Sequence, residues 1–164
     1  MRKIALVVGV ISLWLAAGVA NSRTLPDPYR NPGMTNPGVT QANIKRTICK
    51  SGWTTTIRPP TSYTNALKRQ QIDEYGYRDK TLANYEEDHI ISLQLGGHPR
   101  DPRNLWPQPY NVTCGARVKD VIETKLKRLV CAGDITLLQA QQMIAQNWVE
   151  AYARYVRPLT CPHP

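Results

Sequence analysis

The sequence predicts an α+β fold in which a small β-ribbon is the only sheet component and helices flank it. Its 164 residues are typical of one domain rather than two. Two short β-like segments lie near the middle, over residues 82–95 and 104–106, with a glycine-containing loop between them. Segments with helical spacing of apolar residues follow them. The order strand, loop, strand, helix, with helices on either side, favours α+β over a layered parallel sheet.

Residues 1–20 are predicted to be a secretory signal peptide. Arg2 and Lys3 precede an apolar run over residues 4–20, and small residues at 18–20 suit a cleavage site. The alternative is an uncleaved anchor, because the run is close to the lower limit of about 17–25 residues for a spanning helix. No other segment is long and apolar enough to span a bilayer. We therefore expect a secreted or periplasmic protein without stable membrane association after cleavage.

The mature chain is predicted to be basic. The formal net charge of +9 falls to +7 on removal of the signal peptide, because that segment contains Arg2 and Lys3 and no acid. A small basic domain is attracted to polyanions such as nucleic acid, anionic lipid or acidic glycans. The alternative is that the charge serves solubility alone.

The four cysteines all lie in the mature part, at Cys49, Cys114, Cys131 and Cys161. In an exported chain an even number of cysteines indicates disulfides. The absence of a Cys-x-x-Cys pair argues against a zinc knuckle. Spacing does not choose among the three pairings, and we favour Cys49–Cys131 with Cys114–Cys161.

The N-terminal part of the mature chain is predicted to contain little core. Residues 21–43 are rich in Pro, Asn, Gly and Thr without apolar periodicity, so we expect a flexible or extended lead-in to a domain over residues 44–164. Residues 52–58 are short and β-branched and are predicted to form a strand that ends at Pro59.

Three helices are predicted from caps and apolar spacing. Thr61 or Ser62 caps the first, which runs to about Tyr75. The second runs from near Gly115 to about Val130, and Gly133 follows it as a stop signal. Thr136 caps the third, over residues 137–155. The expected core positions of the last two helices are Val118, Ile122, Leu126, Leu129, Leu137, Met143, Ile144, Trp148 and Tyr152.

One series of residues around the β-ribbon carries the strongest indication of function. Asp88-His89 is followed by Gly96-Gly97 and then by Asn104-Leu105-Trp106-Pro107, where Pro107 and Pro109 are expected to end the second strand. This series resembles the motif of the ββα-metal (HNH) nucleases. With Lys119-Asp120, Glu123, Val130-Cys131 and Asn147-Trp148 further along, the chain looks like a small exported bacterial or phage-borne subgroup of that family. The resemblance implies a phosphodiester-cleaving site.

His89 is the expected general base of that site. A neutral imidazole titrates near physiological pH and can take a proton from water. The alternative is a structural histidine bonded to the backbone. The resemblance implies that Asp88 binds a divalent metal ion, foremost Mg²⁺, with Mn²⁺, Ni²⁺ or Zn²⁺ as alternatives. Because neighbours on a strand point to opposite faces, a distorted strand end is needed for both side chains to reach one phosphate.

The resemblance gives Asn104 the role of holding the loop between the strands, since its amide has both donors and an acceptor. At the third family position the chain departs from the pattern, because no histidine occurs between His98 and His163. We expect Asp120 or Glu123 to complete the metal site instead, and Lys119 to hold a phosphate oxygen. The alternatives are an exposed Lys119–Glu123 pair and the use of Asn111. Glu86 and Glu87 are expected to be solvated, with binding of a second ion or tuning of His89 as the alternatives. The partly basic face formed by Lys68, Arg69, Gln70 and Gln71 is also expected to be solvated, with contact to phosphate as the alternative.

The sequence therefore predicts an exported, metal-dependent endonuclease acting on DNA, with RNA as the alternative substrate and with little sequence preference. A non-catalytic basic module that binds nucleic acid or the envelope on a degenerate HNH scaffold is the second hypothesis. A structural zinc site formed by His89, His98 and Cys114 is the third. The basic residues expected to meet the phosphate backbone are Arg100, Arg103, Arg117, Lys119, Lys125, Lys127 and Arg128.

Overall fold

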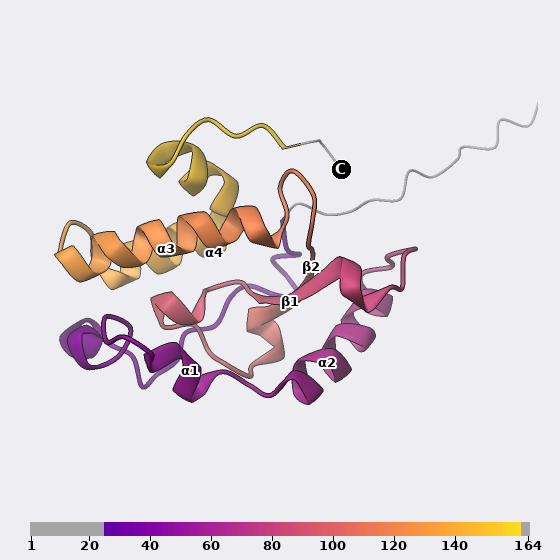
Figure 1. The fold of residues 1–164 in the computed structure, drawn as a ribbon, viewed down its shortest axis with the longest axis horizontal. Coiled ribbons are helices and arrows are strands. Elements are labelled where there is room, and N and C mark those ends of the chain that lie inside the picture. Colours follow the sequence, from indigo (N-terminus) through magenta and orange to yellow (C-terminus); the bar gives the residue numbers. More distant parts are fainter. Residues whose placement is uncertain (1–24, 162–164) are drawn as a thin grey trace, which may run out of the picture.

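A computed structural model describes residues 25–161 and confirms the α+β class. The helices are α1 (Trp53–Ile57), α2 (Thr61–Glu74), α3 (Ala116–Ala132) and α4 (Leu137–Tyr155). The strands are β1 (Tyr85–His89) and β2 (Leu105–Pro109), and four short 3₁₀ turns connect the elements: η1 (Gln41–Arg46), η2 (Leu82–Asn84), η3 (Leu93–Leu95) and η4 (Pro102–Asn104). The two strands lie between α3 and α4 on one side and α1 and α2 on the other (Figure 1).

The predicted signal peptide, residues 1–20, lies outside the described residues. Within residues 25–161, none of the helices combines the length and the apolar character that crossing a bilayer requires.

The strands pair antiparallel, from Tyr85 opposite Pro109 to His89 opposite Leu105. The expectation that the second strand stops at Trp106, before Pro107, is wrong, because β2 includes Pro107 and ends at Pro109. Just beyond the ends of the paired segments, Ile90 N–H donates to Asn104 and Tyr110 N–H donates to Asn84. Bonded pairs alternate with non-bonded pairs in an antiparallel ladder. Both prolines therefore fall at non-bonded positions, where the missing N–H is not needed.

The predicted strand over residues 52–58 is also wrong, because this segment forms the one-turn helix α1. Gly52 enters it in the left-handed conformation at φ 75°. The hydroxyl of Thr56 donates to the carbonyl of Trp53, so this segment forms hydrogen bonds within itself rather than with a neighbouring strand. β-Branched residues favour strands chiefly by packing against neighbouring strands, and the sheet described here offers this segment none.

The predicted helices α2, α3 and α4 are confirmed, with two differences in detail. The residue that caps α2 is Pro60, without a side-chain hydrogen bond, rather than Thr61 or Ser62. Helix α4 is broken at Asn147 (φ −163°, ψ 90°), whose side-chain oxygen accepts from the two N–H groups of Val149 and Glu150. This is the bond pattern of an N-cap, so the second half of α4 begins as a new helix.

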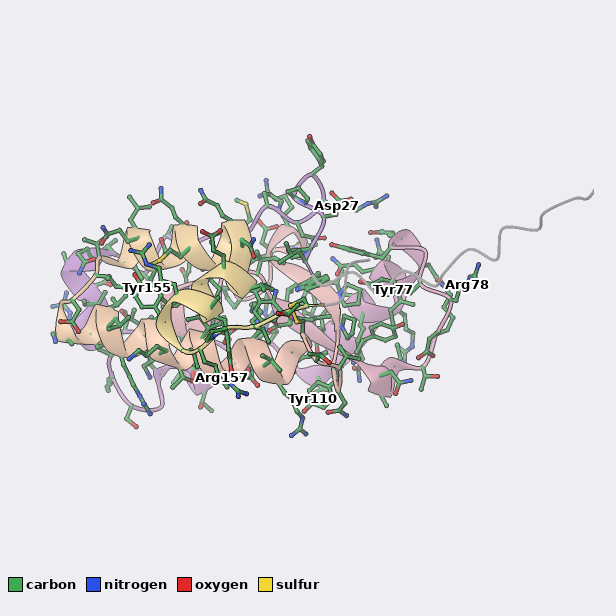
Figure 2. The ribbon with its side chains drawn as sticks, turned by 90° about the horizontal axis from the view of Figure 1, so that it is seen from above. Asp27, Tyr77, Arg78, Tyr110, Tyr155 and Arg157 are labelled. Atoms are coloured by element: carbon green, nitrogen blue, oxygen red, sulfur yellow. A yellow bond between two sulfur atoms is a disulfide. The ribbon has the colours of Figure 1, made fainter. Side chains whose placement is uncertain are left out.

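The core between α3 and α4 agrees with the predicted positions. Ile122 and Leu126 of α3 and Ile144 and Trp148 of α4 are almost fully buried. Gly133 ends α3 in the left-handed conformation, and Thr136 caps α4 by accepting from Gln139 N–H. A second, smaller cluster, formed by Ile72, Tyr77 and Tyr85, joins α2 to β1. Tyr77 and Tyr155 mark these two regions, far apart along the molecule in Figure 2.

The described part of the lead-in, residues 25–43, belongs to the packed structure, contrary to expectation. Val39 is part of the main core. The side-chain amide of buried Asn31 donates to the carbonyls of Pro102 and Leu105 at 2.8 and 2.7 Å. The segment is attached mainly through such polar bonds, which leave no apolar periodicity in the sequence.

The favoured disulfide pairing is confirmed, with bonds Cys49–Cys131 and Cys114–Cys161. They tie the two ends of α3 to the η1 region and to the C-terminal segment. Two disulfides indicate an oxidising environment outside the cytosol. Because Cys114 is bonded to Cys161, the zinc site with His89 and His98 is wrong.

Removing one disulfide should lower stability without changing the fold. The Cys49–Cys131 bond closes a sequence separation of 82 residues. Replacing both cysteines by serine should therefore lower the free energy of unfolding by about 2–4 kcal/mol, measured by urea denaturation. The matched control is the Cys114/Cys161 double serine variant, with a separation of 47 residues and a similar or slightly smaller loss. An unchanged unfolding midpoint in the first variant would contradict the assignment.

Candidate functional site

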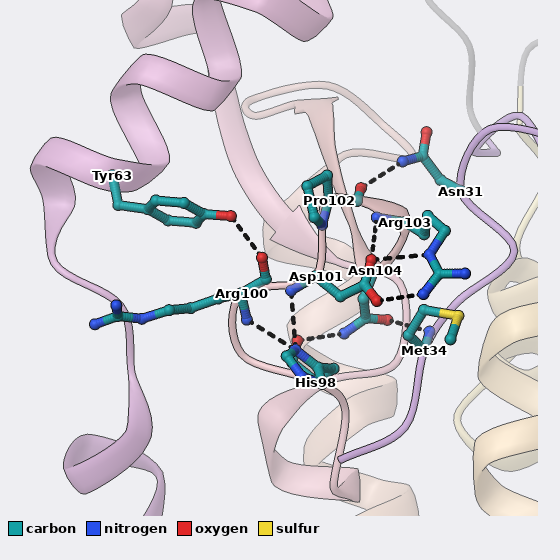
Figure 3. Close-up of polar contacts among 9 residues, drawn as sticks. All are labelled: Asn31, Met34, Tyr63, His98, Arg100, Asp101, Pro102, Arg103 and Asn104. Atoms are coloured by element: carbon teal, nitrogen blue, oxygen red, sulfur yellow. Dashed lines mark hydrogen bonds and ion pairs between the residues drawn. The ribbon is translucent and has the colours of Figure 1, made fainter. Parts of the chain in front are cut away.

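The loop between β1 and β2 is held by a single buried amide. Asn104 is fully buried, and its Nδ2 donates to the carbonyls of Ile91 and His98, both at 3.0 Å. Its Oδ1 accepts from the N–H groups of Ile91 at 2.9 Å and Met34 at 3.1 Å. Figure 3 shows the amide between His98 and Met34. Every hydrogen-bonding direction of the amide is used, so Asn104 fixes the loop and also joins it to the N-terminal segment.

The glycine pair in this loop is required by close packing. A Cβ at Gly97 would lie 1.6 Å from the carbonyl oxygen of Ile91 and 2.9 Å from Nδ2 of Asn104. Gly96 has φ 73°, in the left-handed region that favours glycine. The turn can therefore approach Asn104 only without side chains.

The tip of the loop is braced by polar contacts of its own (Figure 3). Nδ1 of His98 accepts from the N–H groups of Arg100 and Asp101 at 3.2 and 2.9 Å. The hydroxyl of Tyr63 in α2 donates to the carbonyl of Arg100. Arg103 forms an ion pair with Asp101 at 2.7 Å, so it is less available for a phosphate than the sequence suggested.

A buried group of three charged side chains lies between β1 and α3. It consists of Asp88, Lys119 and Glu123, and we call it the ion cluster. Lys119 Nζ donates to Asp88 Oδ2 at 2.8 Å, to the His89 carbonyl at 2.7 Å and to Glu123 Oε1 at 2.5 Å. Asp88 Oδ1 accepts from His89 N–H at 2.8 Å, and Glu123 Oε2 accepts from Ser92 at 2.7 Å. All four carboxylate oxygens thus have a donor.

Lys119 is the cation of this cluster. Burial alone would lower its pKa, but the two carboxylates raise the pKa above its ordinary value. Burial also raises the pKa of Glu123, while the Lys119 ammonium opposes this. An ammonium has three N–H donors, and all three are used. The alternative of an exposed Lys119–Glu123 pair is therefore wrong, and no donor of Lys119 is left for a phosphate oxygen.

The expected metal ligands divide into two groups. Asp88 and Glu123 converge on one cation, as expected, but that cation is the lysine. Asp120 is exposed and makes no hydrogen bond to the cluster within the described chain. No three His, Cys, Asp or Glu side chains in residues 25–161 lie together as a metal-binding group. Asn111, the further candidate, is exposed in the turn before α3.

His89 contacts a different part of the structure from its neighbour Asp88. Its side chain is buried, and Nε2 lies 3.1 Å from the carbonyl oxygen of Pro99 in the loop. A carbonyl oxygen only accepts, so Nε2 carries the proton and Nδ1 keeps a lone pair. Burial lowers the pKa of His89 to about 4, although the bond to Pro99 opposes this. The ring is thus neutral at pH 7 and bonded to backbone through Nε2, and the lowered pKa makes it a weak base in this state.

A cleft of about 390 Å³ lies beside His89, between β1 and the α1–α2 segment. Asp88 does not line it. The charged or aromatic residues that do are Arg58, Lys68, Tyr85, Glu86, Glu87, His89 and Tyr110.

The carboxyl groups of Glu86 and Glu87 are shielded rather than solvated, contrary to expectation. Burial, followed by the charge of Asp88, raises the pKa of Glu86 to about 7. Burial raises the pKa of Glu87 to about 8, with Lys68 opposing. Both oxygens of Glu87 are buried and have no hydrogen-bond partner within the described chain. At pH 7 Glu87 is therefore mainly a neutral carboxylic acid beside a neutral imidazole.

Two cations of the cleft differ in availability, and sequence reasoning missed the role of both. Lys68 is buried rather than solvated, and Nζ donates to the carbonyls of Leu82 and Tyr85 at 3.0 and 2.8 Å. Arg58 is exposed, and its guanidinium makes no hydrogen bond or ion pair with the described residues. Its positive charge is one of the causes that lower the pKa of His89. Of the two cations that line the cleft with His89, Arg58 is therefore the one available to a ligand.

Comparison with family models, with curated proteins and with solved structures finds no match to this chain. The functional interpretation accordingly depends on the geometry of the site and on the motif resemblance.

Replacing Asn104 should destabilise the protein severely. Asn104→Ala would leave the Ile91 N–H and two carbonyls of the loop, and the Met34 N–H of the N-terminal segment, without their partner, at about 1–3 kcal/mol for each buried group that stays unpaired. We expect the free energy of unfolding to fall by about 3–5 kcal/mol in urea denaturation. Asn84→Ala is the control, because Asn84 is exposed and bonds to Asp79, and it should cost less than about 1 kcal/mol. Equal losses in the two variants would refute the loop-holding role.

Replacing Glu87 should change how stability depends on pH. The folded pKa of about 8 lies above the ordinary value of 4.5. Between these values the folded state holds a proton that the unfolded state has released, so this group makes stability fall as pH rises. Glu87→Gln cannot lose a proton. The variant should gain more than about 1 kcal/mol relative to the parent between pH 5 and pH 8, measured by urea denaturation at each pH. Parallel pH profiles would show that Glu87 is ionised in the folded state.

Proposed function

We propose that the protein is an exported endonuclease of the ββα-metal (HNH) type, which hydrolyses phosphodiester bonds in nucleic acid. The observation that carries the proposal is the state of His89. Its imidazole is neutral, Nε2 is fixed by Pro99 so that Nδ1 keeps its lone pair, and His89 and Arg58 line the same cleft. A phosphate bound by Arg58 would favour the protonated imidazole and raise its pKa toward neutrality, which suits a general base that activates water next to the phosphate.

The chemistry follows from these positions. Nδ1 of His89 takes a proton from a water molecule, the resulting hydroxide attacks the phosphorus, and the P–O bond to the leaving sugar oxygen breaks. The leaving oxygen takes a proton from solvent water, and His89 returns its proton to solvent. Arg58 binds non-bridging oxygens of the phosphate and offsets their charge. Asn104 is a positioning residue, because it holds the loop whose Pro99 carbonyl orients the imidazole.

The order of elements around the site also supports the proposal. An antiparallel pair, β1 and β2, is followed directly by α3, and α3 contributes Lys119 and Glu123 opposite β1. This is the strand–strand–helix order that the motif implies. The two disulfides support export.

The divalent ion implied by the resemblance does not fit the expected ligands as they stand. Asp88 and Glu123 are fully occupied by Lys119, His89 N–H and Ser92, and a metal ion would have to displace the ammonium. The proposed cleavage therefore uses the side chains of His89 and Arg58 without a metal ion at Asp88.

DNA is the proposed substrate, with RNA as the alternative. The net charge of +9 in the whole chain favours a polyanion. Exposed cations such as Lys125 and Arg128 on α3 would contact the sugar–phosphate backbone, which carries no sequence information. Little sequence preference and a steep loss of binding with salt are expected.

The ion cluster also favours a second function. If cleavage requires a divalent ion at Asp88, the ammonium of Lys119 at that position prevents cleavage. The protein would then be a non-catalytic module that binds nucleic acid. This hypothesis predicts salt-sensitive binding and no cleavage under any condition.

A plasmid-cleavage assay tests the first proposal. The purified mature protein should convert supercoiled plasmid to nicked and linear forms. His89→Ala should lower the rate about 10²–10⁴-fold, because the general base is lost. Arg58→Ala should lower it as well, through the loss of charge at the phosphate. Arg46→Ala, an exposed arginine in η1, is the matched control and should be unaffected. Each reaction is run with chelator and with added Mg²⁺ or Mn²⁺.

Equal cleavage by the parent and His89→Ala would reject the assignment of the base. Salt-sensitive plasmid binding without cleavage in every metal condition would establish the second function instead.

A further inference from the structure

The ion cluster has the geometry of a cation site whose cation is already part of the chain. Three oxygens surround Lys119 Nζ at 2.5–2.8 Å: Asp88 Oδ2, the His89 carbonyl and Glu123 Oε1. Carboxylate and carbonyl oxygens are the ligands that hard divalent ions prefer. The side chain of Lys119 is 2% exposed, so its ammonium is enclosed between β1 and α3.

We propose that the ammonium of Lys119 is the permanent cation of this cluster and takes the position that a divalent metal ion would otherwise occupy between Asp88 and Glu123. The native protein then binds no divalent ion at this pair of carboxylates. The assignment of the cation does not depend on nuclease activity. Its consequence for catalysis, that His89 and Arg58 act without a metal ion at Asp88, rests on the proposed function.

Charge balance explains why the position must be filled. Two ionised carboxylates buried together repel each other and lose their hydration, and a buried charge without its partner is strongly destabilising. Lysine meets this requirement from within α3, because its four-carbon stem reaches Asp88 on β1 while Glu123 lies one turn further along the same helix. The bond between strand and helix is consequently independent of the concentration of metal ions.

The same geometry predicts the effect of removing the ammonium group. Lys119→Ala leaves Asp88 Oδ2, Glu123 Oε1 and the His89 carbonyl facing a space that has lost its positive charge. These three oxygens are a donor set suited to Mn²⁺. The variant should therefore become a protein that needs a metal ion for stability, which the native protein is not.

The first test uses the native protein and Mn²⁺ alone. Isothermal titration calorimetry should detect no Mn²⁺ binding that depends on Glu123. Thermal unfolding should be the same, within about 1 °C, in chelator and in millimolar Mn²⁺, as expected for a ligand that does not bind the folded state. Mn²⁺ binding by the native protein that Glu123→Gln abolishes would overturn the proposal.

The second test uses Lys119→Ala, with the double variant Lys119→Ala/Glu123→Gln as the control. In chelator the single variant should melt well below the native protein. Saturating Mn²⁺ should raise its melting temperature by about 5–10 °C, and the double variant should gain much less. A folded single variant with no greater response to Mn²⁺ than the native protein would overturn the proposal. If the variant does not fold under either condition, the titration of the native protein decides.

These measurements separate the two proposals. A protein that cleaves no plasmid but shows the expected Mn²⁺ behaviour keeps the cation assignment and loses the nuclease function. A protein that cleaves plasmid only with a divalent ion, and binds that ion through Asp88 and Glu123, keeps the nuclease function and loses the cation assignment.

Discussion

The buried contact between Lys119 and Asp88 is the interaction on which the rest of the site depends. It joins β1 to α3 in a place from which water is excluded, where each lost partner would leave an unpaired charge. Lys119 also binds the carbonyl of His89, so the same ammonium fixes the backbone of the proposed base. The position of the imidazole is thus set by a side chain that never faces the cleft.

The sequence predicts that Asp88 and His89 act on one phosphate, but their side chains contact different parts of the structure. Alternation along a strand sends adjacent side chains to opposite faces, and β1 keeps this rule to its last residue. Asp88 turns to α3 and forms part of the ion cluster, whereas His89 contacts the loop carbonyl of Pro99 and lines the cleft. Asp88 therefore stabilises the packing of β1 on α3, and His89 lines the cleft of the proposed active site.

Local signals predicted most of the fold, and non-local packing accounts for the failures. The apolar spacing of α3 and α4, Gly133 and Thr136 are local features, and each was interpreted correctly. The strand expected over residues 52–58 failed because β-branched residues need a partner strand. The burial of Asn31 depends on carbonyls more than 70 residues away, which no local pattern encodes. In the site, Lys119 and Glu123 were identified from helical spacing, but their burial against Asp88 changes their expected role. Arg58 gave no signal at all, since only the packing of the α1–α2 segment brings it to His89.

Asp88 contacts α3, whereas His89 lines the cleft. The positive charge that the proposed phosphodiester cleavage needs must therefore come from another residue of the cleft. Cleavage of a phosphodiester needs positive charge close to the base that activates water. The ammonium of Lys119 is enclosed and its three donors are used, and Lys68 is bonded to two carbonyls. The neutral acid Glu87 adds no negative charge to repel a phosphate at pH 7. In the proposed nuclease, the guanidinium of Arg58 would bind the phosphate, because Arg58 lines the same cleft and has no hydrogen-bond or ion-pair partner among the described residues. The proposed site is therefore assembled across the cleft, with its base on β1 and its cation on the segment that follows α1.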